Sequence, residues 1–395
     1  MKLVGERASF ATLACDRAWV EIDLAALAHN VSQLKSLLSP ATAMLAVVKA
    51  DAYGHGAITV AQTVLQSGAS WLGVATVLEG IELREAGIEA PILILGATHI
   101  PEQVQAIAHW RLQPTLCNLK QALVFSETLK ATSETAALPV HINIDTGMSR
   151  LGPSWQQAAE FVQLVQRLPN LYIASIYSHL ATAESRDQTV MRQQQSRFEQ
   201  VIAQIKTDET SLWYGNKPAE ASLHLANSAA TLTDSTLHYN MVRVGLALYG
   251  LYPAAHLQRV VDLKPVLQVK ARVTQVKTIP SGSGVSYGHQ FITKQELRLA
   301  VVGIGYADGV PRNLSNKMTV LLRGQRVPQI GTITMDQLML DVSSIPDLQI
   351  GEVVTLLGRQ AEESVSADDW ATQLGTISWE ILCGFKHRLP RVAVG

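Results

Sequence analysis

Hydrophobic residues in the first two-thirds of the chain fall into short, almost continuous runs. Longer stretches follow most of these runs, and their apolar residues have the spacing of amphipathic helices, as in 57–69 and 79–87. The eight runs lie at 44–50, 71–76, 91–97, 112–118, 140–146, 173–180, 222–228 and 241–250. Apolar strands that alternate with helices are typical of a parallel sheet that is buried on both faces.

Repeated strand–helix units predict an α/β fold, and eight of them match a closed (β/α)8 TIM-type barrel. A doubly wound sheet is the alternative, because periodicity alone does not decide closure. After about residue 260 the chain becomes rich in Val, Ile, Leu and Thr, with frequent Gly and Pro, which predicts a mainly β domain. Within it, 366–375 predicts one short helix capped by Ser366. We therefore expect a barrel over 15–258 and a C-terminal β domain over 259–395, with residues 1–14 packing against the latter.

Composition argues against several classes of function. The 395 residues carry a formal net charge of -1, so we expect no basic surface for nucleic acid or an anionic membrane. Charged residues make up 16% of the chain, below the usual ~25%, which favours an oligomer that hides part of its surface. No signal-peptide pattern occurs at 1–10, and no apolar run reaches the roughly 18 residues of a membrane span.

The three cysteines are Cys15, Cys117 and Cys383, which lie far apart in the sequence. Their number and spacing fit neither a disulfide framework nor a set of metal ligands. They are compatible with a reducing compartment. We therefore expect a cytoplasmic protein without a bound metal.

A single lysine, Lys49, ends the first apolar run, and a loop with Tyr53 and His55 follows it. Catalytic groups of a barrel lie at the C-terminal ends of its strands. Apolar surroundings disfavour the charged form of a lysine, so its amine can act as a base or form a Schiff base. A strand-end lysine that only reaches solvent is the alternative, and position alone leaves both open.

Polar or small residues stand at the ends of later runs, and they are Arg150, His179, Asn227, Ser228, Arg243 and Gly245. Ser228 and Gly245 follow the seventh and eighth strands, where barrels of this type commonly bind phosphate. Each residue by itself also has a structural explanation, such as a helix cap for Ser228. Together they indicate a phosphate-bearing ligand beside a lysine, and this combination suggests pyridoxal 5'-phosphate (PLP).

The segment "AVVKADAYGHGA" at 46–57 resembles the PLP-attachment motif of the alanine racemases. Further motifs occur in the order and at spacings comparable to those of that family, and they are "IDTGMSRLG", "YSHLATAES", "HLANSAA", "RVGLALYG", "GVSYGH" and "TMDQLMLD". The starting stretch 19–35 and the ending stretch 379–383 also match. The resemblance therefore covers nearly all of the chain.

The resemblance implies a PLP-binding barrel and a C-terminal β domain, assembled as a head-to-tail homodimer with shared active sites. Lys49 would bind PLP through an imine. The other cofactor-binding residues would be Tyr53, His179, Asn227, Ser228, Arg243, Gly245 and Leu246. Arg243 would face the pyridine nitrogen and donate a hydrogen bond to it, because an arginine stays protonated. A PLP ring with an unprotonated pyridine nitrogen is a poorer electron sink, which discourages transamination and decarboxylation.

Racemisation removes a proton from one face of Cα and returns one to the other face, which two bases do most simply. The resemblance implies Lys49 for the proton of the D-isomer and Tyr287 for that of the L-isomer. A tyrosine with the ordinary pKa of ~10 needs neighbours that lower its pKa. In the family, His179 supports this tyrosine and links to Arg243 and onward to His224.

Substrate binding would involve Arg150 and the Met335 backbone, both near the substrate carboxylate, with Met335 and Tyr287 supplied by the partner subunit. Two positions depart from the family. Asn143 stands where many relatives have a carbamylated lysine that orients the arginine, so we hypothesise a small anion such as chloride between Arg150 and Asn143. His387 stands where some relatives have a tyrosine, which leaves phosphate binding at that point open.

The implied activity is an isomerase that interconverts L-alanine and D-alanine and supplies D-alanine for peptidoglycan. An amino-acid racemase of broader specificity, acting on serine or others, is the nearest alternative. A PLP-dependent decarboxylase shares the fold, but those relatives have an acidic group where this chain has Arg243. A non-catalytic PLP carrier would lack the β domain, and a cofactor-free aldolase built on Lys49 is a further alternative.

Overall fold

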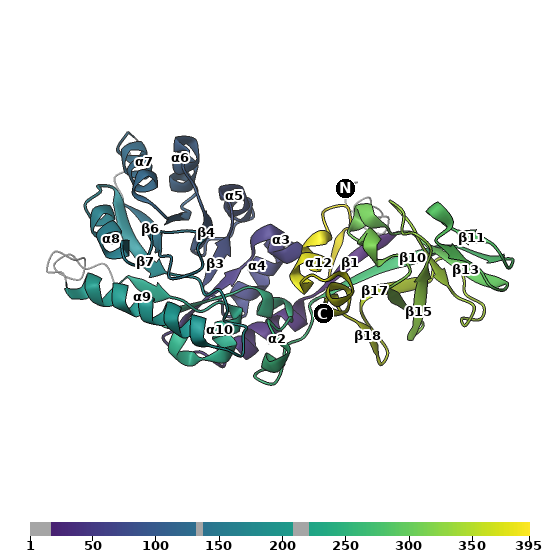
Figure 1. The fold of residues 1–395 in the computed structure, drawn as a ribbon. Helices are drawn as coiled ribbons and strands as arrows, with labels where there is room; N and C mark the ends of the chain where they lie inside the picture. Colours follow the sequence, from purple (N-terminus) through teal and green to yellow (C-terminus); the bar gives the residue numbers. More distant parts are fainter. Residues whose placement is uncertain (1–16, 132–136, 208–220) are drawn as a thin grey trace. The chain divides into compact units, whose positions relative to one another are not determined.

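The computed structural model describes residues 17–131, 137–207 and 221–395 (Figure 1). These residues form two compact units. The barrel unit comprises Ala26–Ala52 and Ala57–Lys264, and the β unit comprises the described residues up to Ala25, Tyr53–Gly56 and Pro265–Gly395. The expected limits of 15–258 and 259–395 stay predictions. The expected packing of residues 1–14 and the position of Cys15 lie outside the described residues.

The barrel unit contains one parallel sheet of eight strands in the order β8-β7-β6-β5-β4-β3-β2-β9 (Figure 1). The strands are β2 (Ala43–Val47), β3 (Trp71–Val74), β4 (Ile92–Ala97), β5 (Gln113–Leu116), β6 (Leu138–Asn143), β7 (Leu171–Tyr177), β8 (Ser222–His224) and β9 (Met241–Val244). The ring closes where Asn240 N donates to Leu223 O at 3.0 Å and Arg243 N donates to Ala226 O at 2.9 Å. All eight predicted strands are therefore confirmed, and the alternative of an open, doubly wound sheet is wrong.

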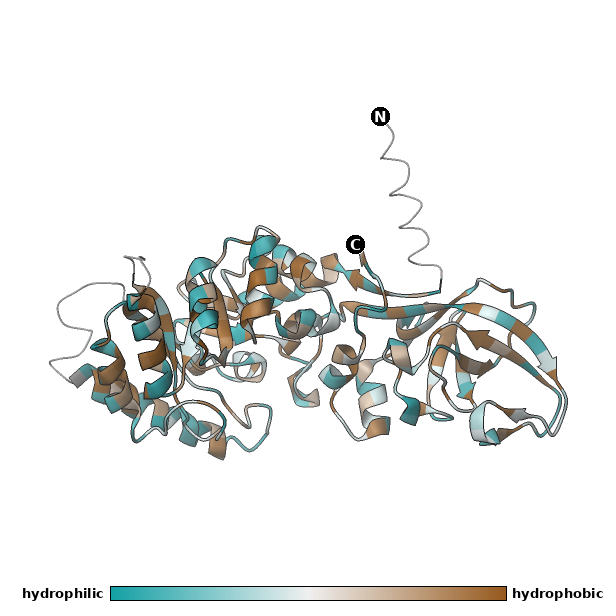
Figure 2. Ribbon diagram, turned by 90° about the horizontal axis from the view of Figure 1, so that it is seen from above, coloured by the Kyte–Doolittle hydropathy of each residue, from teal (hydrophilic) through white to brown (hydrophobic). Residues whose placement is uncertain are grey.

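Helices cover the outside of these strands because each has one apolar face. In α4 and α8 the buried residues recur at intervals of three and four positions, as packing on a sheet requires. Figure 2 shows apolar, brown residues along the strands and mixed brown and teal residues on the helices. The helices are α2 (Leu24–Lys35), α3 (Lys49–Gly54), α4 (Ala57–Gln66), α5 (Val77–Glu85), α6 (Pro101–His109), α7 (Leu119–Lys130), α8 (Ala158–Gln166), α9 (Thr189–Thr207) and α10 (Ser228–Thr233), with 3-10 helices η1 (Ser235–Leu237), η2 (Leu246–Tyr249) and η3 (Ala255–Leu257).

The β unit is built on a nine-stranded sheet in the order β18-β17-β14-β15-β16-β13-β10-β1-β19. An additional pairing of β10 with β17 joins six of these strands into a ring. The strands are β1 (Ala18–Asp23), β10 (Leu267–Ile279), β13 (Leu297–Val302), β14 (Thr319–Leu322), β15 (Gln325–Ile330), β16 (Leu338–Asp341), β17 (Val353–Gln360), β18 (Glu363–Val365) and β19 (Arg391–Val394), beside a hairpin of β11 (Gly284–Val285) and β12 (Phe291–Ile292). The prediction that this part of the chain is mainly β is confirmed.

Local signals explain how several elements of the β unit begin and end. Buried and partly buried residues alternate along the first half of β10, as expected for a strand with one face on a core. Helix α11 (Ala367–Leu374) starts at the predicted cap, where Ser366 Oγ accepts from Asp369 N at 3.1 Å and the Asp369 carboxylate accepts from Ser366 N at 2.8 Å. A second helix, α12 (Ser378–Gly384), and 3-10 helices η4 (Tyr287–His289), η5 (Tyr306–Asp308) and η6 (Arg312–Leu314) complete the unit. No helix in the described ranges is long and apolar enough to span a membrane.

Candidate active site

The backbone that follows β2 is left-handed. Residues 50–53 have φ values between 52° and 55°, although none of them is a glycine. This conformation is unfavourable by roughly 1–2 kcal/mol for each L-residue. The turn lies in α3, where Ala52 N donates to Val48 O at 2.9 Å, and it begins at Lys49 and includes Tyr53. Strain of this kind persists only where the surroundings hold it, and it is concentrated at functional sites.

Arg243 lies inside the barrel, with only 4% of its surface exposed. Its guanidinium donates to His224 Nδ1 at 2.9 Å, to Ser178 O at 2.7 Å and to His179 Nδ1 at 3.2 Å. It also lies 5.0 Å from the centre of the Tyr177 ring, which stacks on the His224 ring at 4.7 Å. No carboxylate pairs with Arg243 among the described residues, so neutral acceptors alone satisfy this buried cation.

The hydrogen-bonded row continues beyond His224 through neighbouring strands. Ser175 Oγ lies 2.7 Å from His224 Nε2 and 2.5 Å from His141 Nδ1, and His141 Nε2 lies 2.7 Å from Gln113 Oε1. Since Arg243 can only donate, His224 Nδ1 must accept and His224 Nε2–H must donate to Ser175. The same logic makes Ser175 the donor to His141 and His141 the donor to Gln113. The direction of every bond in the row is therefore fixed by one arginine.

The charges of three cations act on the His179 imidazole. Burial and, to a smaller extent, the positive charges of Arg243, Arg150 and Lys49 together lower the pKa of His179 to about 3. Arg243 keeps its charge at neutral pH, because burial lowers its pKa only to about 10. A group of cations around a neutral imidazole is suited to a ligand that carries more than one negative charge.

The loops after β8 and β9 meet at Ser228. Asn227 caps α10 by accepting a hydrogen bond from Ala230 N at 3.0 Å, and Ser228 is the first residue of that helix. Ser228 Oγ accepts from Gly245 N at 3.0 Å and from Ala247 N at 3.4 Å. Leu246 then begins η2. The structure therefore brings these sequence-predicted residues together as small side chains and backbone N–H groups, which suits an anion such as a phosphate.

Arg150 lies in a loop that folds back on the end of β6. Asp145 Oδ1 accepts from Gly147 N at 2.9 Å and from Ser149 N at 3.0 Å, and a Cβ at Gly152 would lie 2.3 Å from Asn143 O. Asn143 is buried, whereas Arg150 is exposed. Among the described residues, no hydrogen bond or ion pair orients the Arg150 guanidinium. The predicted anion between Arg150 and Asn143 stays a prediction.

In the β unit, Tyr287 and Met335 lie on exposed loops, and 73% of the Tyr287 surface and 52% of the Met335 surface are accessible. Ser286, with φ 61° and ψ -168°, lies in a region that is occupied almost only by glycine. Its hydroxyl donates to Thr332 O at 2.6 Å, and Thr332 Oγ1 donates to Tyr287 O at 2.8 Å. A strained but tethered backbone therefore presents Tyr287 to the solvent.

Three further residues that the sequence singled out, Tyr53, His55 and His387, belong to the β unit. Burial raises the pKa of Tyr53 to about 12, with a smaller contribution from Cys383. His55 is buried, and its Nδ1 lies 3.1 Å from Tyr53 O. His387 is exposed. In the barrel unit, burial raises the pKa of Cys117 to about 11, which makes this thiol unreactive.

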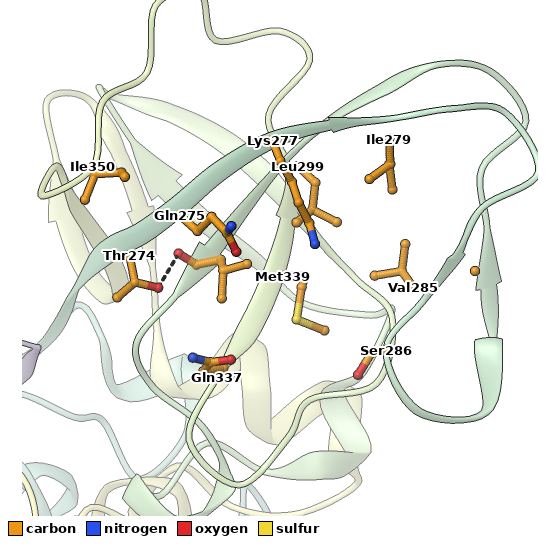
Figure 3. Close-up of a pocket in the computed structure, with 12 residues that line it drawn as sticks. Thr274, Gln275, Lys277, Ile279, Val285, Ser286, Leu299, Gln337, Met339 and Ile350 are labelled. Carbon is orange, nitrogen blue, oxygen red and sulfur yellow. Dashed lines mark hydrogen bonds between the residues drawn. The ribbon is translucent and has the colours of Figure 1, made fainter.

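A cavity of about 580 Å³ in the β unit is lined by residues of β10, β13 and the loop at Ser286 (Figure 3). Figure 3 shows the Lys277 amine and the Gln275 amide among the lining side chains. Thr274 Oγ1 donates to the backbone oxygen of Val301 at 3.2 Å. Among the described lining residues, Lys277 alone carries a charge. Because the cavity lacks a pair of groups for acid–base chemistry, the end of the barrel near Lys49 is the candidate active site. No group of three His, Cys, Asp or Glu side chains in the described ranges is placed to hold a metal ion.

Comparisons with known proteins cover nearly the whole chain. Residues 22–253 match the family model "Alanine racemase, N-terminal domain", and residues 266–393 match "Alanine racemase, C-terminal domain". The chain is 70% identical over 378 residues to the alanine racemase of Nostoc sp. (strain PCC 7120), with 96% of each chain covered. It is 61% identical to that of Synechocystis sp. (strain PCC 6803), with 96% of this chain and 99% of the other covered.

Solved structures give the same result. The alanine racemase of Clostridium difficile 630 has a TM-score of 0.89 and 32% identity, with 96% of each chain covered. The alanine racemase of Bartonella henselae, solved with covalently bound pyridoxal phosphate, has a TM-score of 0.82 and 31% identity, with 96% of this chain and 99% of the other covered. The similarity therefore extends over both units.

The buried imidazoles predict a dependence of stability on pH. Burial lowers the pKa of His141 and of His179 to about 3, and that of His224 well below its usual value. In the unfolded chain each titrates near ~6.5. Below that pH the unfolded chain binds more protons than the folded protein, so the free energy of unfolding falls as the pH drops, by up to about 1.4 kcal/mol per pH unit for each histidine.

Urea denaturation at several pH values between 7.5 and 5 measures this slope. The substitution His141→Gln should reduce the slope, whereas His99→Gln, at an exposed position, should leave it unchanged. Equal slopes in the two variants would contradict the prediction.

Proposed function

The chain belongs to the alanine racemase family, and from that premise we propose that it interconverts L-alanine and D-alanine with PLP as its cofactor. The observation that carries the proposal is the buried Arg243, which donates to His179 Nδ1 at 3.2 Å, together with Lys49 and Arg150, whose positive charges act on the same imidazole. A lysine amine in a cationic pocket suits a ligand that bears an aldehyde and a phosphate. The relative that is 70% identical is itself named alanine racemase.

The residues at this end of the barrel fit PLP. Lys49 would hold the cofactor covalently, and Tyr53, Asn227, Ser228 and the backbone at Gly245 and Leu246 would hold its phosphate. When bound, the cofactor withdraws electrons from the substrate Cα and makes its proton easier to remove. The solved relative from Bartonella henselae carries covalently bound pyridoxal phosphate, which supports this choice of cofactor.

Arg243 would donate a hydrogen bond to the pyridine nitrogen of the cofactor. Its other N–H groups are held by His224, Ser178 and His179, so its position is set by the barrel itself. A protonated guanidinium has no lone pair for a ring proton, so the ring nitrogen of a bound cofactor would stay unprotonated. This favours proton exchange at Cα over decarboxylation, and the absence of a carboxylate partner of Arg243 among the described residues agrees with it.

Two residues would move the proton at Cα. Lys49 would serve one face of the substrate, and Tyr287 from a second copy of the chain would serve the other. The exposure of Tyr287 and Met335 supports a role for both in a neighbouring subunit, with the Met335 backbone near the substrate carboxylate. His179 would then donate its Nε2–H to the Tyr287 oxygen, because its Nδ1 accepts from Arg243.

The proposal therefore includes a homodimer in which each subunit completes the active site of the other. Its biological role would be the supply of D-alanine for peptidoglycan in the cytoplasm. Arg150 would bind the substrate carboxylate, with His224 supporting Arg243 from behind.

The reaction itself can be tested with the purified protein in deuterated water. L-Alanine should become deuterated at Cα and partly converted to D-alanine, because the proton removed exchanges with solvent. L-Serine should react only moderately more slowly than L-alanine, because a pocket that fits a methyl group rejects one added hydroxyl only modestly. L-Lysine should not react. Chiral chromatography and mass spectrometry measure both products, and unlabelled alanine after prolonged incubation would refute the proposed function.

The roles of the two bases predict different defects. Lys49→Ala should abolish the cofactor absorbance that borohydride bleaches, because no amine remains to hold the aldehyde. Tyr287→Phe should keep that absorbance but slow the conversion of L-alanine at least ~100-fold. Tyr172→Phe, at an exposed tyrosine of β7, is the matched control and should behave like the wild type. Normal turnover of Tyr287→Phe would remove this residue from the mechanism.

A small anion should take the place of the carbamylated lysine that many relatives have where this chain has Asn143. We propose that chloride lies between the Arg150 guanidinium and the Asn143 amide, because no described residue pairs with Arg150. A crystal soaked in bromide should show an anomalous peak at this position, and Asn143→Leu should remove it. An empty site in the bromide-soaked wild-type crystal would contradict the assignment.

A further inference from the structure

Glu79 connects the left-handed turn to the neighbouring strand. One carboxylate oxygen, Oε1, accepts from Ala50 N at 2.7 Å. The other, Oε2, accepts from Ala75 N at 2.7 Å and from Thr76 N at 3.0 Å. Ala75 and Thr76 lie between β3 and α5, and β3 is the direct neighbour of β2 in the barrel. A single side chain therefore joins the ends of two adjacent strands.

The contact at Ala50 acts directly on Lys49. The Ala50 N–H belongs to the peptide plane that follows Lys49, so fixing its direction fixes the ψ angle of Lys49. The first N–H groups of any helical turn have no partner within the turn and need one from outside. An ionised carboxylate is the strongest acceptor that a side chain can provide for such a group.

The strain of the turn makes this acceptor necessary. Residues 50–53 all have positive φ without the help of glycine, and Ala52 N donates to Val48 O at 2.9 Å across the turn. At its other end, Asp51 Oδ1 accepts from Ala57 N at 2.7 Å, which ties the turn to the start of α4. Without Glu79, the Ala50 N–H would lose the carboxylate that accepts from it, and the peptide after Lys49 could return to an ordinary conformation.

We propose that Glu79 is a positioning residue for Lys49: its carboxylate holds the left-handed turn from which the reactive amine extends. This inference rests on the proposed function, because it assigns Glu79 to the same reaction. Glu79 does not touch the reacting atoms in this role, and it acts only through the backbone of the turn.

Glu79 also belongs to a capping box, which gives it a second, purely structural role. Thr76 Oγ1 accepts from Glu79 N at 3.3 Å, while the Glu79 carboxylate accepts from Thr76 N, and together they cap α5. Thr76→Ala removes one half of this box and leaves the contact between Glu79 and Ala50. It is therefore the matched control that separates the capping of α5 from the positioning of Lys49.

The first measurement needs no cofactor and no activity. Hydrogen–deuterium exchange of the cofactor-free full-length protein, followed in peptides that span 49–54, reports the protection of the Ala50 amide. Glu79→Gln and Glu79→Ala should raise the exchange rate there at least ~10-fold, since a lost charge-assisted hydrogen bond corresponds to about a factor of ten or more. Thr76→Ala should stay within about twofold of the wild type in these peptides.

The second measurement is the steady-state racemisation of alanine by the holoenzyme. Misplacement of a reactive group by about 1 Å can slow a reaction ~100-fold. We therefore expect Glu79→Gln and Glu79→Ala to lower kcat between ~10-fold and ~100-fold, with little change in KM and with an altered visible circular dichroism of the bound cofactor. Thr76→Ala should keep wild-type kcat and circular dichroism. The near-isosteric Glu79→Gln keeps the test decisive where Glu79→Ala fails to fold.

Two results would overturn the inference. In the first, Thr76→Ala shows the same loss of protection and of kcat as the Glu79 variants, so that capping of α5 explains both. In the second, Glu79→Gln keeps wild-type protection and kcat. A wild-type protein that does not racemise alanine would refute the proposed function instead, and the exchange measurement would still decide whether Glu79 holds the turn.

Discussion

The buried guanidinium of Arg243 is the constraint around which the barrel interior is arranged. A cation inside a core needs partners for its N–H groups, and here neutral acceptors at the ends of β7 and β8 provide them. Because an arginine can only donate, it fixes the tautomer of His224 and, through Ser175, that of His141. The same residue closes the barrel, since its backbone N–H donates to Ala226 O. Arg243 therefore contributes both to the closure of the barrel and to the electrostatics of its interior.

Backbone strain is the second common feature of the residues assigned to the reaction. Residues 50–53, after Lys49, are left-handed without glycine, and Ser286, before Tyr287, lies in a region that glycine usually occupies. In each case a short hydrogen bond holds the strained peptide, from Ala50 N to Glu79 and from Ser286 Oγ to Thr332 O. Such tethers convert an unfavourable conformation into a fixed direction for the neighbouring side chain, which a loop of ordinary conformation would not provide.

Much of the fold could be predicted from the sequence. The eight barrel strands and the helix cap at Ser366 were predictable because burial on both faces and end-capping leave patterns within a few residues. Among the site residues, Lys49, Asn227 and Ser228 were found from their positions at strand ends, and Tyr287 from its motif alone. Glu79 was missed, although its spacing of three residues from Thr76 is the signature of a capping box. Its second contact, with Ala50, has no signal in the local sequence.

The sequence by itself determined which segments are buried strands, where the mainly β domain begins, and which side chains follow each strand. Only the tertiary structure decided closure of the barrel, the pairing of β1 with β10 and β19, and the gathering of Arg243, Arg150 and Lys49 around His179. The physical reason is the range of the interactions. Apolar periodicity and capping act between residues a few positions apart, whereas β1 and β10 are separated by more than 200 residues and pair only when the whole chain has folded.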